Sequence, residues 1–281
     1  MRKLKIVADS GADLYVMDGV DYVSVPLTIS AARDYVDTAA LDKAAMVADL
    51  ALYNGKSHTA CPSPAAFLAA CGEAEEVFCV TISRHLSCSY NAACVAAEQW
   101  RAEHPAGKIY VLDSLSVGPE MLMHVQRIAE LAALDVAFED ICVEIEAYRD
   151  HCGVIFSLES LHNLANNGRV NPLAARLSGL IGIRVVGDGT GGVLNPTDKL
   201  RGEKKALQGI VRKMREMGYD GHRVQIDHVQ NESGALALQT LLRRAWPEAE
   251  VSIAPCGGLC CYYAEKGGLI VGFETKEAQP A

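Results

Sequence analysis

The sequence predicts an α/β fold made of two α/β domains, and two observations support this prediction. Short apolar runs rich in β-branched residues alternate along the chain with segments of helical spacing. That alternation is typical of a mainly parallel sheet covered by helices. In addition, 50% of the 281 residues are hydrophobic, which is enough to bury one large core or two ordinary ones.

The N-terminal domain is expected over residues 1–152. Its predicted strands are 3–9, 21–29, 76–83, 108–114 and, at the boundary, 152–158. Its predicted helices are 41–52, 91–104, 121–134 and 138–151. Because strands and helices take turns, we expect a mainly parallel sheet flanked by helices.

The C-terminal domain is expected over residues 153–281, since a different order of elements begins near Gly153. A short helical run, a hairpin and a helix come first, at 158–168, 181–200 and 203–218. A strand, a helix, a strand and a Gly/Cys-rich end follow, at 223–229, 235–246, 250–255 and 256–261. This order predicts a mixed sheet with helices. The tail at 276–281 is predicted to be disordered.

The stretch GDGTGG at 187–192 has the glycine spacing of a dinucleotide-binding loop but lacks its context. Such a loop follows a strand and opens a helix. Here the segment VLNPTDKL follows, with Pro196 and residues compatible with a strand. The sequence therefore favours a glycine-rich hairpin turn.

The formal net charge of −9 argues against a nucleic-acid partner, because phosphate binding needs a basic surface. The first residues, MRKLKIVADSG, reach an aspartate after a short apolar run, which fits neither a secretion signal nor a membrane span. No later run reaches about eighteen apolar residues. We expect a cytoplasmic protein with at most transient membrane contact.

The ten cysteines are predicted to be reduced. Several lie in apolar stretches such as VFCVTIS and DICVEI, where cysteine behaves as a small hydrophobic residue. The cluster CGGLCC, with Cys256, Cys260 and Cys261, lacks the paired spacing of a closed zinc site. Packed thiols are the favoured interpretation and a metal- or redox-responsive site is the alternative. We predict no bound metal.

Hydroxyl groups gather just before two predicted helices. Thr59 and Ser63 lie in HTACPSPAAF, and Ser87 and Ser89 precede NAACVAAEQW. Hydroxyls and exposed amides at a helix start can hold an anion. The same residue types are also the usual N-caps of helices. Both roles remain open from the residues alone, and Ser63 can fill both.

A serine hydrolase is an alternative, because His58 and His85 lie near these serines in sequence. A small esterase or thioesterase would use Ser87 or Ser63 as its nucleophile. The chain has no GxSxG motif, and no spacing identifies a nucleophile, a base and an orienting acid.

Basic residues gather between Lys199 and Arg223 although the chain is acidic overall. The helix that begins near Gly202 is expected to bury Ala206, Leu207, Ile210, Val211, Met214 and Met217. Most of the charges then face outward, as a solvated face or as a docking surface.

Several motifs, in the same order and at similar spacing over nearly the whole chain, resemble the DegV family. KIVADSGADL, with Asp9 and Ser10, resembles the family's DSTADL turn. The other matching segments are SVPLTI, TACPSP at 59–64, ISRHLSCSYNAA at 82–93, KIYVLDS, LHNLANNGRV at 161–170 and KLRGEKKA at 199–206.

This resemblance implies a fatty-acid-binding subunit of a bacterial fatty acid kinase. Such a subunit holds a long-chain fatty acid at the domain interface, and a separate ATP-binding kinase subunit phosphorylates the carboxylate. It has no catalytic residues and no cofactor of its own. The implied ligand-binding residues for the carboxylate are Thr59, Ser87, Ser63, Ser89 and Tyr263, and Thr59 and Ser87 are the ones that match the family's carboxylate-holding hydroxyls. A carrier subunit also needs a surface that docks the kinase subunit, and our candidates for it are Arg169 after the NNG turn and Arg201 and Lys205 in KLRGEKKA.

The implied function fits simple energetics. Each buried methylene contributes about 0.8 kcal/mol, whereas a buried carboxylate must be hydrogen-bonded to avoid a desolvation cost. We expect hydroxyl and amide donors to hold it without a permanent cation.

Three residues depart from the family pattern. Cys61 replaces a glutamine, Cys88 replaces a glycine, and Tyr263 aligns with a histidine that helps to bind the carboxylate. A phenol donates one hydrogen bond but carries no positive charge near neutral pH. The ligand is therefore expected to differ or to bind more weakly.

Overall fold

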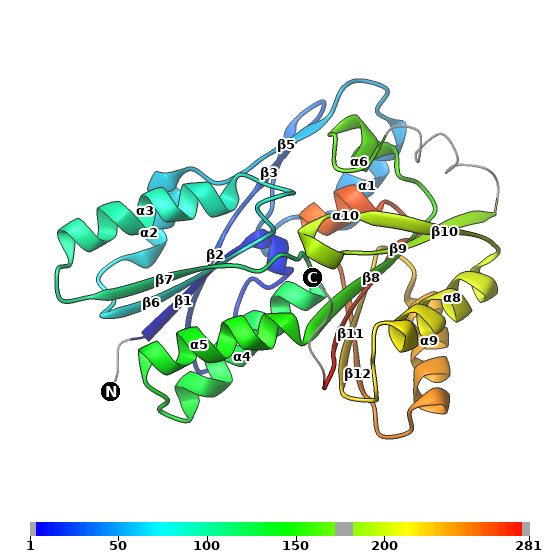
Figure 1. Ribbon diagram of the computed structural model, residues 1–281. Coiled ribbons are helices and arrows are strands. Elements are labelled where there is room, and N and C mark those ends of the chain that lie inside the picture. The colour runs from blue at the N-terminus through cyan, green and yellow to red at the C-terminus, as the bar shows by residue number, and fades with distance from the viewer. Residues whose placement is uncertain (1–3, 172–181, 277–281) are drawn as a thin grey trace.

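A computed structural model of the chain describes residues 4–171 and 182–276. The N-terminal half contains a four-stranded sheet in the order β2-β1-β6-β7 (Figure 1). Its strands are β1 (Leu4–Asp9), β2 (Asp21–Val25), β6 (Glu76–Thr81) and β7 (Lys108–Asp113). All three pairings are parallel, as predicted.

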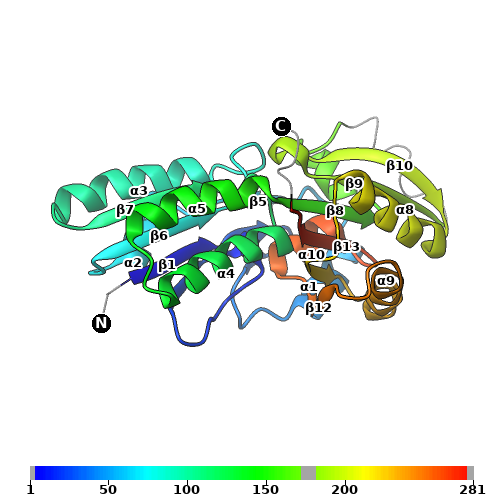
Figure 2. The same cartoon turned by 60° about the horizontal axis from the view of Figure 1, so that its bottom comes forward.

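Helices cover both faces of this sheet because its strands are apolar on both sides. Ile6 and Phe78 pack toward α4 (Pro119–Ala133) and α5 (Phe138–Asp150). Val7 follows Ile6 in β1, and Val77 precedes Phe78 in β6, so both point to the opposite face of the sheet. There they pack toward α2 (Pro64–Cys71) and α3 (Ser89–Glu103). Figure 2 shows the sheet between the two helix pairs.

The C-terminal half contains a mixed six-stranded sheet in the order β10-β9-β8-β13-β11-β12. The strands are β8 (Cys152–Leu158), β9 (Ile183–Asp188), β10 (Asn195–Arg201), β11 (Arg223–His228), β12 (Glu250–Pro255) and β13 (Leu269–Glu274). Only the β11–β12 pair is parallel within the described residues. The helices α8 (Glu203–Glu216) and α9 (Glu232–Ala245) pack on one face.

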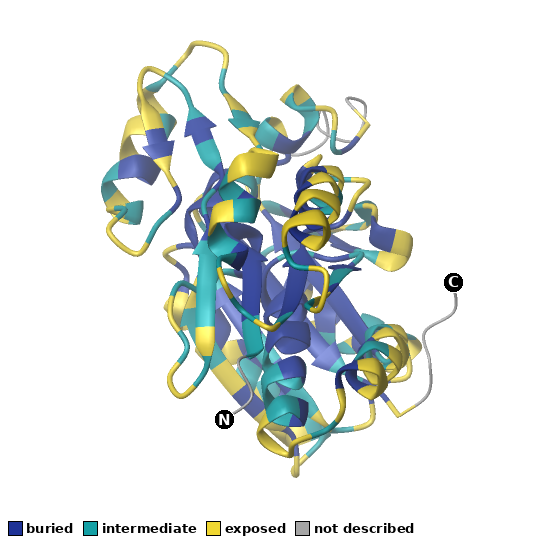
Figure 3. Ribbon diagram, turned by 90° about the vertical axis from the view of Figure 1, so that its left-hand side faces the viewer, coloured by how far each residue is buried: buried dark blue, intermediate teal, exposed yellow. Residues whose placement is uncertain are grey.

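A small antiparallel sheet lies beside the two larger ones, at the top of Figure 1. It consists of β3 (Thr28–Ser30), β4 (Asp34–Val36) and β5 (His58–Ala60). The helix α1 (Lys43–Leu52) and β3 contact α10 (Gly258–Ala264), which also contacts α6 (His162–Asn166). The 3-10 turns η1 (Ser10–Ala12) and η2 (Thr190–Gly192) complete the described elements. Figure 3 shows the buried residues concentrated in the sheets.

The predicted α/β fold with a parallel and a mixed sheet is confirmed. The predicted strand 21–29 is instead two strands, β2 and β3, because Pro26 interrupts it. The strands β4, β5 and β13 and the helix α10 were not predicted. The GDGTGG segment forms the turn of the antiparallel β9–β10 hairpin, as predicted. The tail lies outside the described residues from 277 onward.

The strand predicted at 152–158 in the N-terminal domain is β8, and it joins the six-stranded sheet instead. We therefore propose that the two domains divide one or two residues before the expected boundary at 152/153, between α5, which ends at Asp150, and β8, which begins at Cys152. No helix in the described ranges is long and apolar enough to cross a membrane. The predicted buried stripe of α8 is confirmed at Ala206, Leu207, Ile210 and Met214.

The prediction that the cysteines are reduced is correct for eight of them and wrong for two. Cys256, Cys260 and Cys261 are buried free thiols, as predicted for packed thiols. Cys61 and Cys88, in contrast, form a disulfide. Neither of them lies in an apolar strand, and the fold brings two loops 27 residues apart in sequence to a Cα–Cα distance of 6.0 Å.

Candidate functional site

An apolar pocket lies between the parallel sheet's loops and the six-stranded sheet. Its free space is about 60 Å³. The lining residues are Ile82, Leu86, Val117, Val154, Phe156, Leu158, Leu164, Arg169, Leu194, Leu259, Cys260, Tyr263, Ala264 and Ile270. Arg169 and Tyr263 are therefore the only lining residues with a charged or hydroxyl group among those described.

The strand β8 shows why the sequence builds this pocket. Val154, Phe156 and Leu158 alternate along the strand and line the pocket, whereas Ile155 points to the opposite face and packs under α8. Because β8 is apolar on both faces, one face packs in the core and the other face lines the pocket.

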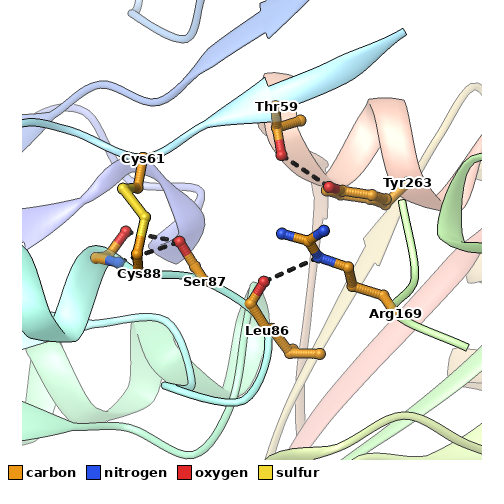
Figure 4. The surroundings of a disulfide bond; sticks show 8 residues. Thr59, Cys61, Leu86, Ser87, Cys88, Arg169 and Tyr263 are labelled. Atoms are coloured by element: carbon orange, nitrogen blue, oxygen red, sulfur yellow. Dashed lines mark hydrogen bonds between the residues drawn. A yellow bond between two sulfur atoms is a disulfide. The ribbon is translucent and has the colours of Figure 1, made fainter. Parts of the chain in front are cut away.

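Arg169 lies at the pocket edge with its guanidinium group between Leu86 and Tyr263 (Figure 4). Its Nε donates to the carbonyl of Leu86 over 3.0 Å, and another of its N–H groups donates to the carbonyl of Asn167. Gly168 precedes it with φ +72°, a conformation that favours glycine and turns the chain toward the pocket. The guanidinium is thereby held by backbone carbonyls on two sides.

Tyr263 and Thr59 form the next part of the site. The Tyr263 hydroxyl lies 2.7 Å from Oγ1 of Thr59, across 204 residues of sequence. Burial raises the pKa of Tyr263, although Thr59 and Arg169 oppose the shift. The phenol is therefore protonated at neutral pH and can donate a hydrogen bond.

The short helix α10 positions Tyr263. Its first backbone N–H groups, of Gly258 and Leu259, donate to the carboxylate of Asp37 over 2.8 and 2.9 Å. The Tyr15 hydroxyl donates to the same carboxylate over 2.6 Å. An aspartate from the N-terminal half of the chain thus caps a helix of the C-terminal half.

Ser87 approaches from the loop after β6, next to the pocket residue Leu86. Its Oγ accepts from the Ser89 amide over 3.2 Å and lies 3.0 Å from the Ser89 hydroxyl. Ser89 is fully buried and hydrogen-bonds toward Asp9, whose pKa is raised to about 7 by burial. The buried Ser89 therefore holds the Ser87 hydroxyl in position through these two contacts.

Ser63 is exposed, and its Oγ accepts from the Ala66 amide over 3.2 Å. The capping role that the residues alone left open is thus the one seen for Ser63 at the start of α2. Ser63 and Ser87 make these hydrogen bonds to Ala66 and Ser89, and no histidine is bonded to either serine in the described parts of the chain. The arrangement lacks the nucleophile–base pair of a serine hydrolase.

The residues predicted to dock a partner do not lie in one place. Arg201 and Lys205 are exposed where β10 meets α8, whereas Arg169 lines the apolar pocket. The structure also differs from the expectation of a site without a permanent cation, because Arg169 places its charge beside Tyr263. The sequence shows Gly168 and Arg169 as part of a motif. The direction of the Arg169 side chain, however, depends on its hydrogen bond to the Leu86 carbonyl.

The other alternative, a metal site at CGGLCC, has no support in the geometry. Within residues 4–171 and 182–276, no group of three or more His, Cys, Asp or Glu side chains is arranged to hold a metal ion. Burial raises the pKa of the Cys256 and Cys260 thiols well above the usual range, which disfavours the thiolates that bind metals.

Comparison with known proteins identifies similar chains. The model of a family described as "Uncharacterised protein, DegV family" matches residues 3–276. A DegV domain-containing protein of Streptococcus pneumoniae is 37% identical over 276 residues, covering 96% of this chain and 98% of the relative.

Two solved structures are close in fold. A DegV family protein from Eubacterium eligens, loaded with heptadecanoic acid, has a TM-score of 0.95 at 38% identity, covering 97% of this chain and 100% of that chain. The Fatty Acid Kinase (Fak) B3 protein of Streptococcus pneumoniae, loaded with linoleic acid, has a TM-score of 0.94 at 37% identity, covering 98% and 100%.

Proposed function

Because the chain belongs to the DegV family, we infer that it binds a long-chain fatty acid and presents the carboxylate to a separate ATP-dependent kinase subunit. It is the binding protein of that reaction and not the enzyme. The similar Eubacterium and Streptococcus structures hold heptadecanoic and linoleic acid. We place the protein in the cytoplasm, where both the kinase and ATP are available.

The observation that carries this proposal is an apolar pocket with its polar groups at one end. Apart from Arg169 and Tyr263, the described lining is hydrocarbon or thiol. An acyl chain gains free energy from burial there, and a carboxylate at the polar end meets donors from both domains. A long acyl chain needs more room than about 60 Å³, so the lining side chains must separate to admit it.

The carboxylate is proposed to lie among Arg169, Tyr263, Thr59 and Ser87. Arg169 supplies the positive charge, and the three hydroxyls supply neutral donors. Because Tyr263 is a neutral phenol near neutral pH, the guanidinium is the main source of positive charge in this proposed site. Ser89 and Ser63 hold the backbone of the two loops and are not proposed to contact the ligand directly.

The direct test is mass spectrometry of an organic extract of the purified protein, followed by titration with heptadecanoic acid. A stoichiometric fatty acid in the extract, or saturable binding of the added one, would support the proposal. A protein that yields no lipid and binds no added fatty acid would contradict it. Ester turnover or a stable acyl adduct on Ser87 would favour the esterase alternative.

The hydroxyl donors can be tested one at a time. Thr59→Val and Ser87→Ala each remove a hydrogen bond to a charged group, worth about 1.5 to 3 kcal/mol. We expect each variant to bind heptadecanoic acid at least tenfold more weakly, measured by competition with a fluorescent fatty acid. The matched control is Ser63→Ala, which should cost about 1 kcal/mol of stability as a lost helix cap and leave affinity unchanged. Equal affinity in all three variants would assign Thr59 and Ser87 to structural roles.

The exposed pair Arg201 and Lys205 remains our proposed docking surface for the kinase subunit. Charges at the edge of a contact mainly increase the association rate and lose their effect as salt rises. The double variant R201A/K205A should bind fatty acid normally but be phosphorylated more slowly at subsaturating concentration, with a weaker salt dependence. The control is Arg243→Ala, an exposed arginine in the last turn of α9. Equal phosphorylation rates in both variants and the parent would remove this surface from the mechanism.

A further inference from the structure

The disulfide between Cys61 and Cys88 joins the two loops that carry the proposed carboxylate donors (Figure 4). Cys61 lies two residues after Thr59, and Cys88 directly follows Ser87. The bond therefore connects both sides of the carboxylate site.

The two loops are otherwise held by different parts of the fold. Thr59 belongs to β5, where it pairs with Ile29 in the small sheet. Ser87 belongs to the loop after β6, and its amide donates to the Ser83 carbonyl over 3.1 Å. A covalent bond between these loops limits how far Thr59 and Ser87 can separate.

This pair is also accessible to small reactants. Cys88 is exposed and Cys61 is partly exposed. Among the eight free cysteines, six are buried, and the partly exposed Cys94 and Cys142 lie on α3 and α5. Thiol–disulfide exchange requires a thiolate to reach one sulfur of the bond, and Cys88 meets that condition best.

We propose that Cys61 and Cys88 form a reversible redox modification site whose reactants are small thiols and their disulfides. In the reducing direction, two thiol molecules attack in succession. The Cys61–Cys88 bond breaks, two cysteine thiols form, and the reactants leave as one disulfide. Two electrons and two protons pass to the protein. The reverse exchange with a small-molecule disulfide restores the bond.

The bond is proposed to set the affinity of the carboxylate site, a consequence that rests on the proposed function. In the oxidised protein the two loops are held at the spacing that the carboxylate needs. In the reduced protein the ligand must order one or two additional side chains, which costs roughly three- to tenfold in affinity. Reduction therefore weakens fatty acid binding without removing any donor.

The experiment uses the full chain in three forms: oxidised, reduced with excess dithiothreitol, and the variant C61S/C88S. Alkylation followed by mass spectrometry should count eight reactive thiols in the denatured oxidised protein and ten after reduction. Heptadecanoic acid should bind roughly three- to tenfold more weakly to the reduced protein and to the variant. Amide hydrogen exchange in residues 58–63 and 83–90 should be faster in the reduced protein and in the variant than in the oxidised protein. The matched control, Cys94→Ser, should respond to reductant like the parent.

Two results would overturn the proposal. One is ten alkylated thiols after treatment with a small-molecule disulfide, which would show that the bond does not form. The other is equal affinity and equal hydrogen exchange in the oxidised and reduced protein. If no form binds fatty acid but reduction still speeds exchange in both loops, the proposed function fails while the redox site is supported.

Discussion

Replacing Arg169 with glutamine is expected to weaken heptadecanoic acid binding by roughly ten- to a hundredfold. Arg169 is the only charged residue among the described lining residues of the apolar pocket. A hydrogen bond to a charged group contributes about 1.5 to 3 kcal/mol, and the apolar surroundings screen the attraction less than water does. The measurement is a competition titration of the parent and the variant at one ionic strength.

The methyl ester of the same fatty acid separates charge recognition from loop structure. Arg169 also holds the carbonyls of Leu86 and Asn167, so its loss can disturb the pocket itself. A charge effect lowers affinity for the acid and leaves affinity for the ester nearly equal to that of the parent. Arg201→Gln, at an exposed residue that does not line the pocket, serves as the control. Equal loss for acid and ester would assign Arg169 a structural role instead.

The regular elements of the parallel sheet could be predicted because their signals are local. Strands such as β1 and β6 contain short apolar runs, and α4 and α8 show clear helical spacing. The break at Pro26 could have been predicted, since proline lacks the N–H group that a central strand needs. The two resulting strands join different sheets, which no local pattern indicates.

The central strand β13 was missed because its sequence is ambiguous. The run LIVGFE follows a glycine-rich segment and contains Gly272, which weakens a strand pattern. The fold requires that glycine, because a Cβ there would lie 2.5 Å from the backbone nitrogen of Glu120 in α4. The close approach of α4 to β13 is a requirement of tertiary structure. In the sequence it appears only as a glycine that weakens the strand pattern.

The candidate site shows the same limit more sharply. The hydroxyls of Thr59 and Ser87 were selected from local motifs and from the family resemblance. The contact between Thr59 and Tyr263, the inward direction of Arg169 and the Cys61–Cys88 bond all join segments that lie far apart in sequence. The residue types of the proposed anion site were therefore predictable, whereas Arg169, the proposed source of positive charge, was not.

The same contact between α4 and β13 leads to a prediction about stability. Glu120 is buried, and the hydroxyl of Ser116 donates to its carboxyl group. Burial raises the pKa of Glu120 from 4.5 to about 8. Between these two values the unfolded chain has released the proton while the folded protein still holds it. The folded state therefore binds more protons in this window, and the free energy of unfolding falls as pH rises through it.

Glu120→Gln is expected to remove this contribution, because an amide keeps the acceptor for Ser116 and does not ionise. The measured quantity is the free energy of unfolding of the variant minus that of the parent. Between pH 4 and pH 8 this difference should change by on the order of 4 kcal/mol in favour of the variant. Urea unfolding of both proteins at several pH values measures this, and subtraction cancels the titration of Asp9 and Asp227, which are buried in both. Glu98→Gln, an exposed site on α3, should follow the parent at every pH. Parallel curves for the parent and Glu120→Gln from pH 4 to pH 8 would mean that Glu120 already ionises as easily in the folded protein as in the unfolded chain.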